Sequence, residues 1–384
     1  MSEPPVIKTA QSIASIPEAD WNACLIDDHP FVTHQFLKAL EDSGSVSAEA
    51  GWMPYHLMLE IDGTLAGVAP MYVKGHSQGE YVFDHSWAHA YERAGGRYYP
   101  KLQLSVPFSP VTGPRLLVPD GPDRSDRQKM LLQGAKQVAE NLSLSSIHAT
   151  FLRSDEQKVM EEMGFLLRTG EQFHWINDGY RTFDDFLENL ASRKRKAIRK
   201  ERREAQNPDF EFETITGSDL TEAHWDAFFG FYMDTGSRKW GTPYLTREFF
   251  TRLGETFGEA VVLFLVKRAG RYIAGALNLQ SRDCLYGRYW GCVEDHRFLH
   301  FETCYYRAID YAIEHGIARV EAGAQGPHKL ARGYLPTKTY SAHWLRDPGF
   351  HDAVADFLMA ETREVDAEIR YLAGHSPFRH SEND

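Results

Sequence analysis

One order of segments occurs in both halves of the chain and constrains the fold more than any other feature. In the first half, two strand-like stretches flank Asp62-Gly63, a dipeptide that favours a tight hairpin turn, and helical and strand patterns follow. In the second half, two strand-like stretches flank residues 269–271, and then a strand, a helix and a short strand follow. Strands that alternate with helices predict an α/β fold with mixed (α+β) sheets. The repeated order predicts two copies of one α/β unit, although no residue-level repeat is visible.

The length of the chain supports this division. At roughly 100–200 residues per domain, 384 residues favour two domains. We predict an N-terminal domain over residues 1–170, a C-terminal domain over 171–347, and a terminal helix with a flexible tail over 348–384. Thr182 is expected to begin one long helix in the second domain, because an apolar stripe at helical spacing continues past residue 198.

Composition excludes several classes of protein. No stretch reaches the ~20 apolar residues that cross a bilayer, and the N-terminus lacks the pattern of a secretory signal. The four cysteines form no CxxC pair, so neither a zinc site nor a redox motif is predicted and no metal is expected. A reducing, cytoplasmic location is expected.

The charge of the chain is unevenly distributed. Residues 193–203 hold eight basic residues and one acidic residue, a net charge of +7 in a chain whose total is −12, so the remainder carries −19. An acidic protein is not expected to bind DNA in general. A local basic segment instead predicts one anionic partner, such as a nucleotide-linked small molecule or tRNA.

Three segments of the second half do not have the pattern of plain scaffold. Glycines interrupt the strand at residues 286–292, which predicts a bulge or the close approach of another backbone. Residues 299–306 begin a helix with polar and aromatic side chains. Residues 321–333 place glycines, an amide, an imidazole and two cations after a strand, where open α/β sheets bind ligands.

These segments resemble the GNAT superfamily of acyltransferases, and the whole chain resembles the Fem-like family of peptidoglycan biosynthesis. The motifs that carry the resemblance are Ser86-Trp87-Ala88 through Tyr91, Tyr98-Tyr99-Pro100-Lys101, Val106-Pro107-Phe108, Thr112-Gly113-Pro114-Arg115, Leu299-His300-Phe301-Glu302, Cys304-Tyr305-Tyr306, Gly323-Ala324-Gln325-Gly326, His328-Lys329 and Arg332-Gly333.

The resemblance implies tandem GNAT-like domains and transfer of an acyl or aminoacyl group to an amine. Fem-type relatives take amino acids from aminoacyl-tRNA, whereas ordinary GNAT members use acyl-CoA and hold its pyrophosphate on a glycine-containing loop. The equivalent residues 294–300 contain no glycine and begin with two carboxylates, which departs from the loop of CoA-binding members. The sequence therefore leaves two donors open, acyl-CoA and aminoacyl-tRNA. A catalytically inactive binding module for an anionic, nucleotide-linked ligand is the alternative.

The candidate site residues follow from the needs of acyl transfer and from similarity to leucyl/phenylalanyl-tRNA–protein transferases. Amide formation requires a base for the amine and donors for the carbonyl. We expect Glu302 as base, His328 as alternative base, and Gln325 as the orienting group. Two alternatives to these roles remain. Glu302 is then a carboxylate that stabilises its helix, and the side chain of Lys194 extends to solvent. The expected substrate-binding residues are Lys194, Arg288, Tyr289, Trp290, Tyr305, Lys329 and Arg332.

Overall fold

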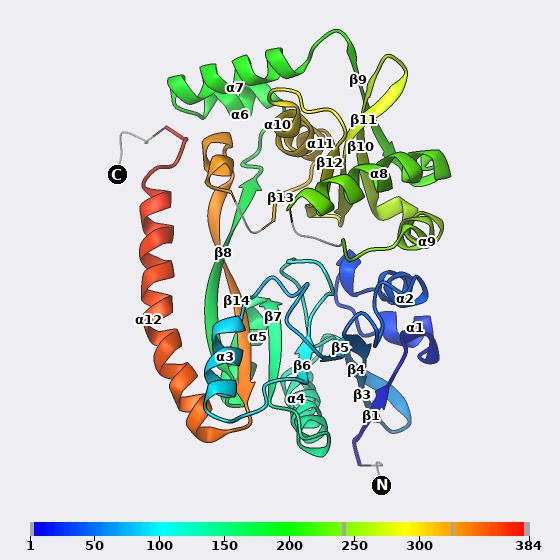
Figure 1. The fold of residues 1–384 in the computed structure, drawn as a ribbon, viewed down its shortest axis with the longest axis vertical. Coiled ribbons are helices and arrows are strands. Elements are labelled where there is room, and N and C mark those ends of the chain that lie inside the picture. The colour runs from blue at the N-terminus through cyan, green and yellow to red at the C-terminus, as the bar shows by residue number, and fades with distance from the viewer. Residues whose placement is uncertain (1–3, 240–242, 324–325, 380–384) are drawn as a thin grey trace. The chain divides into compact units, whose positions relative to one another are not determined.

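The computed structural model describes residues 4–239, 243–323 and 326–379, and its contacts divide the chain into two units (Figure 1). The first unit holds residues 1–170 and 338–366, and the second unit holds residues 171–337 and 367–384. The domains predicted from the sequence assigned residues 338–347 to the second half. Backbone pairing instead assigns them to the first unit, because His343 and its neighbours form a ladder with the strand around His148.

The strands of the first unit form a three-stranded sheet of order β1-β3-β4 and a mixed sheet of order β2-β5-β6-β7-β14. The Asp62-Gly63 turn joins β3 to β4, as predicted. The strands are β1 (Val6–Ala10), β2 (Trp52–Pro54), β3 (His56–Ile61), β4 (Thr64–Ala69), β5 (Met71–Lys74), β6 (Lys101–Leu104), β7 (Ser146–Leu152) and β14 (Leu335–Leu345). The helices are α1 (Glu18–Asn22), α2 (His34–Asp42), α3 (His85–Arg93), α4 (Arg124–Asn141) and α5 (Ser154–Glu162).

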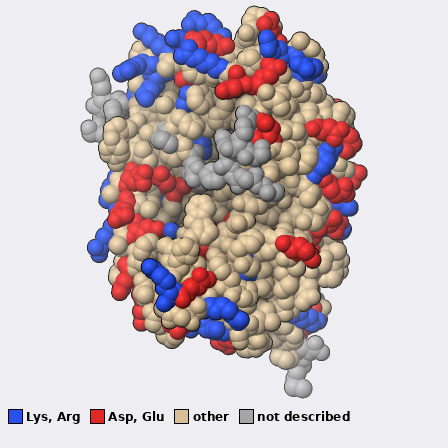
Figure 2. Space-filling model, in the orientation of Figure 1, with Lys and Arg blue, Asp and Glu red and all other residues tan. Residues whose placement is uncertain are grey.

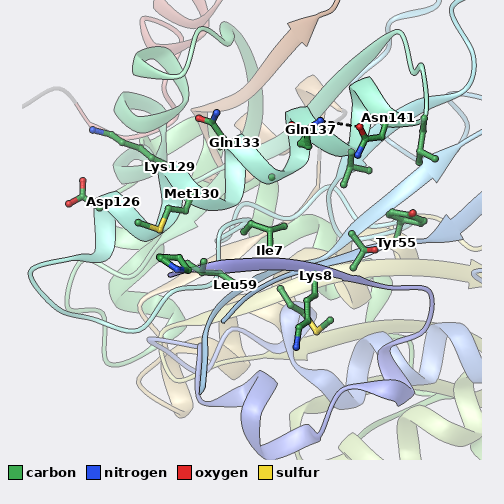
Figure 3. Close-up of a pocket in the computed structure, with 16 residues that line it drawn as sticks. Ile7, Lys8, Tyr55, Leu59, Asp126, Lys129, Met130, Gln133, Gln137 and Asn141 are labelled. Carbon is green, nitrogen blue, oxygen red and sulfur yellow. Dashed lines mark hydrogen bonds between the residues drawn. The ribbon is translucent and has the colours of Figure 1, made fainter. Parts of the chain in front are cut away.

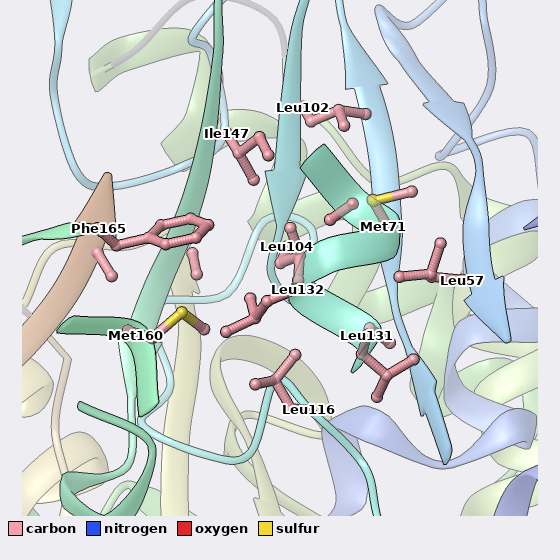
Figure 4. Close-up of a cluster of buried hydrophobic side chains, with 14 of the residues drawn as sticks. Leu57, Met71, Leu102, Leu104, Leu116, Leu131, Leu132, Ile147, Met160 and Phe165 are labelled. Carbon is pink, nitrogen blue, oxygen red and sulfur yellow. The ribbon is translucent and has the colours of Figure 1, made fainter. Parts of the chain in front are cut away.

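The core of the first unit lies on one face of β6 and β7. Leu102, Leu104 and Ile147 point from these strands toward Leu131 and Leu132 of α4, and all five side chains are fully buried (Figure 4). Alternate residues of a strand point to opposite faces, so the polar residues that lie between these apolar positions of β6 and β7 are directed away from this core.

The second unit is built on a sheet of order β8-β13-β12-β11-β10-β9. The predicted hairpin across residues 269–271 is confirmed, since β10 and β11 pair around it. The strands are β8 (Leu166–Ile176), β9 (Phe210–Thr216), β10 (Val261–Arg268), β11 (Arg271–Gln280), β12 (Cys284–Cys292) and β13 (Arg319–Glu321). The helices are α6 (Phe183–Glu188), α7 (Ser192–Ala205), α8 (Glu222–Lys239), α9 (Arg247–Phe257), α10 (Leu299–Phe301), the π-helix η5 (Glu302–Tyr306), α11 (Arg307–Glu314) and the 3₁₀ helix η6 (Pro327–Arg332). The last helix, α12 (Pro348–Ala373), runs through the boundary at residue 366.

The prediction of one long helix from Thr182 is wrong. The chain forms α6 and α7 instead, because Leu190 makes a strand-like bridge to Phe378 and Ala191 takes an extended backbone whose N–H bonds to Pro377 O at 2.8 Å. The apolar periodicity continues through this break, since Leu190 and Ile198 are both buried, and periodicity alone therefore conceals it.

Among the described residues, the structure contains no helix whose length and apolar character would let it span a membrane.

Candidate functional site

The strands β12 and β13 run parallel but pair over only three residues each. Cys284 to Tyr286 pair with Arg319 to Glu321, and β12 then continues to Cys292 without β13. We call the point where this pairing stops the strand fork. Ligands of open α/β sheets bind at the carboxyl ends of such strands, and this makes the fork the natural place for a site.

The glycine-bearing strand has the two features predicted for it. The register between β11 and β12 shifts at Arg288, which becomes the extra residue of a bulge between Gly287 and Tyr289. A Cβ at Gly287 would lie 3.3 Å from Glu321 O, and one at Gly291 would lie 2.3 Å from Phe231 O. Gly291 therefore requires glycine because another backbone approaches, and a side chain at Gly287 would make a tight contact with the backbone of β13.

Lys329 lies at the strand fork. Its side chain is buried, and Nζ donates to Ala322 O at 2.6 Å and to Gly323 O at 3.1 Å, the first carbonyls after β13. Burial lowers the pKa of the Lys329 ammonium to about 8, and the positive charge of Arg288 acts in the same direction. An ammonium group has three N–H donors, so one remains beyond the two carbonyl contacts.

His328 and Tyr305 form a hydrogen-bonded pair beside Lys329. The Tyr305 hydroxyl lies 3.0 Å from His328 Nε2, and the His328 ring stacks on Phe301 with centroids 5.6 Å apart. His328 is exposed, whereas burial raises the pKa of the Tyr305 hydroxyl and keeps it protonated. The structure thus brings together His328, Lys329 and Tyr305, as expected.

Arg332 connects this cluster to α7. Its guanidinium donates to His328 O at 2.6 Å and to Glu201 Oε2 at 2.8 Å, and it lies 3.4 Å from the centroid of the Phe301 ring. These contacts hold η6 and α7 together, and they fix the backbone of the residue that presents the imidazole.

The structure does not support Glu302 as a base. Its fully buried carboxylate accepts hydrogen bonds from Arg202 Nε at 3.1 Å and Nη2 at 3.1 Å and from Gln206 Nε2 at 2.8 Å, and Arg307 Nε lies 3.7 Å away. Both oxygens are therefore occupied by donors from α7. Such a carboxylate joins α7 to η5, which differs from the alternative considered from the sequence, a carboxylate that stabilises its own helix. In this arrangement it is not placed to take a proton from a substrate.

Tyr289 and Trp290 point to opposite faces of β12, as neighbours on a strand must. Trp290 lies beside His300, with ring centroids 5.2 Å apart, on the side of η5. Tyr289 packs edge-on against Tyr232 of α8 at 5.2 Å, away from that cluster. Of the two, only Trp290 joins the aromatic group near His328. The predicted orienting group, Gln325, lies outside the described residues.

The first unit contains a similar parallel pair, but its end is filled. β6 and β7 pair through Leu102 to Leu104, and Gly113 then forms a parallel bridge to Leu152 beyond β6. The fully buried guanidinium of Arg115 donates there to Thr150 O at 2.8 Å and Val111 O at 2.6 Å. A filled strand end leaves the fork of the second unit as the better candidate.

The match to known proteins supports this tandem arrangement. Residues 12–380 match the FemAB-like family, which is described as peptidoglycan biosynthesis/recognition. The chain belongs to the FemAB-like family. No curated protein matches the sequence.

Two solved structures share the fold of this FemAB-like protein. FemX has a TM-score of 0.56 at 14% identity, over 91% of this chain and 100% of that chain. L-PGS from Bacillus licheniformis has a TM-score of 0.52 at 9% identity, over 86% of this chain and 98% of that chain. At these identities the likeness establishes the fold alone.

The segment before α10, where GNAT members hold the pyrophosphate of CoA, contains an ion pair in this FemAB-like protein. Glu294 accepts hydrogen bonds from Arg268 at 2.9 Å and from His296 at 2.9 Å. These bonds lower the pKa of the Glu294 carboxyl and keep it negatively charged. Arg268 and His296 are thereby engaged by a carboxylate of the protein and not by an anion of a ligand.

The basic segment forms the exposed part of α7. Figure 2 shows Lys and Arg side chains gathered over this helix. Arg199 pairs with Asp184 at 2.9 Å, and Arg202 pairs with Glu302 and Asp310. Within the described ranges, five basic side chains of α7 have no ion-pair partner: Arg193, Lys194, Arg195, Lys196 and Arg203.

Sequence reasoning gave no role to a buried polar cluster in the first unit. Lys101 Nζ donates to Glu80 Oε2 at 2.7 Å and to Asp84 Oδ2 at 2.5 Å, and the Tyr98 hydroxyl donates to Asp84 at 2.6 Å. His148 joins through Tyr98 at 3.2 Å. A pattern in the sequence could have indicated this cluster. Polar and apolar residues alternate from Lys101 to Leu104 and from Ser146 to Thr150, so one face of each strand is polar.

The first unit also has an open hollow of about 1090 Å³ between β1, β3 and α4 (Figure 3). Ile7 and Leu59 lie on the sheet side, and Gln133 and Gln137 lie on α4. None of the predicted site residues lines it.

Proposed function

We propose that this protein transfers an aminoacyl group from aminoacyl-tRNA to an amine at the strand fork. The observation that carries the proposal is the buried Lys329 ammonium, held by two carbonyls at the end of β13, next in the chain to the exposed His328, which bonds to the buried Tyr305 hydroxyl. A charge donor and a proton acceptor in one place are what amide formation from an ester requires.

The reaction forms one bond and breaks another. The acceptor amine attacks the ester carbonyl carbon, the C–N bond forms, and the C–O bond to the ribose breaks. Lys329 donates its remaining N–H to the carbonyl oxygen as negative charge develops there. His328, whose Nε2 is hydrogen-bonded to Tyr305, accepts a proton from the attacking amine and passes it to the ribose oxygen as the C–O bond breaks. Removal of one such oxyanion donor costs roughly 10²–10³ in kcat in known cases.

Two features favour tRNA over CoA as donor. Before α10, Glu294 already occupies Arg268 and His296, which would otherwise be available to a pyrophosphate. The unpaired cations of α7 offer a surface for an RNA backbone, whose phosphates dominate the affinity of nucleic-acid complexes. The acceptor amine of this proposal is carried by a peptidoglycan precursor, a choice that the family description, peptidoglycan biosynthesis/recognition, supports.

The test is transfer of a radiolabelled amino acid from total charged tRNA to a peptidoglycan precursor that carries a free amine, with acetyl-CoA in a parallel reaction. We expect transfer from tRNA alone, and a loss of about 10²-fold or more in kcat for Lys329→Met. Lys158→Met, which removes an exposed lysine of the first unit, is the matched control and should retain full activity. Acetyl transfer without aminoacyl transfer would contradict the proposal.

A further inference from the structure

A second hollow, of about 320 Å³, lies between the first turns of α7 and the end of η6. The apolar part of its wall comes from two alanines and Ile198. Its charged lining consists of Arg193, Lys194, Glu201 and Arg332.

The charge of this lining is positive. It holds three cations and one carboxylate, and that carboxylate is already engaged, since Glu201 Oε2 accepts from Arg332 at 2.8 Å and from the Tyr306 hydroxyl. Arg193 and Lys194 have no ion-pair partner in the described part of the chain. The hollow is therefore short of negative charge.

The backbone adds to this deficit. The hollow lies at the N-terminus of α7, a helix of 14 residues whose N-cap, Ala191, makes no side-chain capping hydrogen bond. The first N–H groups of a helix have no partner within it, and together with the helix dipole they favour an anion.

Arg332 is a fixed part of this lining. It is 6% exposed, and its two terminal nitrogens donate to His328 O at 2.6 Å and to Glu201 Oε2 at 2.8 Å. These bonds hold the guanidinium, and its positive charge, at the wall of the hollow.

We propose that this hollow is a phosphoryl-binding subsite. Phosphate oxygens accept several charge-assisted hydrogen bonds at once, as the guanidinium, the ammonium and the helix terminus require. The subsite deepens the proposed function, because a phosphoryl group belongs both to the end of a tRNA and to a nucleotide-linked acceptor. The hollow of Figure 3 is a poor alternative, since its Lys8 and Lys129 are already paired with Glu60 and Glu162.

The test uses inorganic pyrophosphate and isothermal titration calorimetry on the full chain, with no transfer step. We expect Lys194→Met to weaken binding by about tenfold or more, which is the loss of one charge-assisted hydrogen bond. Lys196→Met removes the same charge from the same helix, outside the lining of the hollow, and should bind as the native protein does. Equal affinity of these two variants would overturn the proposal.

A second variant changes affinity in the opposite direction. Glu201→Gln removes the one carboxylate of the lining, so pyrophosphate should bind more tightly, and weaker or unchanged binding with native circular dichroism would contradict the subsite. Competition then separates the sources of the phosphoryl group. Displacement of pyrophosphate by a nucleoside diphosphate indicates the acceptor, and displacement by uncharged tRNA indicates the donor. Displacement by neither would refute a substrate subsite. Pyrophosphate binding without aminoacyl transfer would refute the proposed reaction alone.

Discussion

Glu302 and Lys329 show why residue type did not determine residue role. Both are charged, both lie in motifs that resemble those of the family, and both were assigned to the site from the sequence. Glu302 lies opposite Arg202 and Gln206, which occupy both of its oxygens, whereas Lys329 contacts only two carbonyls. The hydrogen-bond partners of each side chain decide its role. The partners of Glu302 lie about 100 positions away in the sequence, and motif spacing cannot predict contacts at that distance.

Glu302→Gln should therefore affect stability more than chemistry. The substitution leaves Arg202 with Asp310 alone as its charged partner, and we expect a loss of about 3 kcal/mol in the free energy of unfolding. Urea denaturation measures it. Asp310→Asn changes the half-exposed partner of the same guanidinium and should cost less than about 1 kcal/mol. A Glu302→Gln protein with native stability and no turnover would restore Glu302 as the base.

The pKa of the Lys329 ammonium predicts how kcat/KM falls at alkaline pH. The ammonium is the donor, and burial lowers its pKa to about 8, so kcat/KM should fall as the pH rises through about 8. Lys329→Arg keeps a positive charge at all these pH values and should remove this limb, at reduced overall activity. A limb that persists unchanged in Lys329→Arg would show that another group titrates.

At the scale of elements, hairpins and helix patterns were predictable, whereas interruptions were not. Asp62-Gly63 marks its turn because few residue pairs adopt that backbone. The break between α6 and α7 depends on Phe378, almost 190 residues after Leu190, and the filled strand end of the first unit depends on Gly113 and Arg115 in a segment without periodicity. Local pattern carries no information about such distant partners.

The exposed face of α7 predicts the salt dependence of tRNA binding. The logarithm of the association constant for tRNA falls linearly with the logarithm of the salt concentration. Each phosphate contact that is lost makes this negative slope shallower by roughly 0.7–0.9. The double variant Lys196→Gln, Arg203→Gln should therefore show a shallower slope for uncharged tRNA in a filter-binding titration. The double variant Lys8→Gln, Lys158→Gln removes two exposed lysines of the first unit and is the charge-matched control. An unchanged slope in the double variant would remove this helix from the RNA surface.

The polar face of β6 and β7 predicts how the stability of the protein changes with pH. Burial raises the pKa of the Glu80 carboxyl to about 7, so the folded state holds this proton more tightly than the unfolded state does. The resulting stabilisation is present below pH 4.5 and is lost as the pH rises to about 7. Glu80→Gln keeps a neutral group there. Its stability relative to the native protein should rise between pH 5 and pH 7, and a constant difference in urea denaturation would contradict this.

At the scale of the whole molecule, two units of one architecture have different strand ends. In the first unit Arg115 fills the end of the parallel pair, whereas in the second unit the fork is bordered by Lys329 and by the bulge at Arg288. The order of segments was sufficient to predict the tandem α/β fold, whereas the location of the chemistry in the second half stays a prediction. It did not predict that residues 338–366 return to the first unit, because that depends on the β7–β14 ladder.

The most direct measurement is a crystal structure of the protein with a non-hydrolysable aminoacyl-adenosine, in which an amide replaces the ester. The account predicts that the aminoacyl carbonyl oxygen lies about 3 Å from Lys329 Nζ, with His328 beside the carbonyl carbon. An aminoacyl group bound away from the strand fork, with Lys329 still closed on its two carbonyls and no ligand contact, would contradict it.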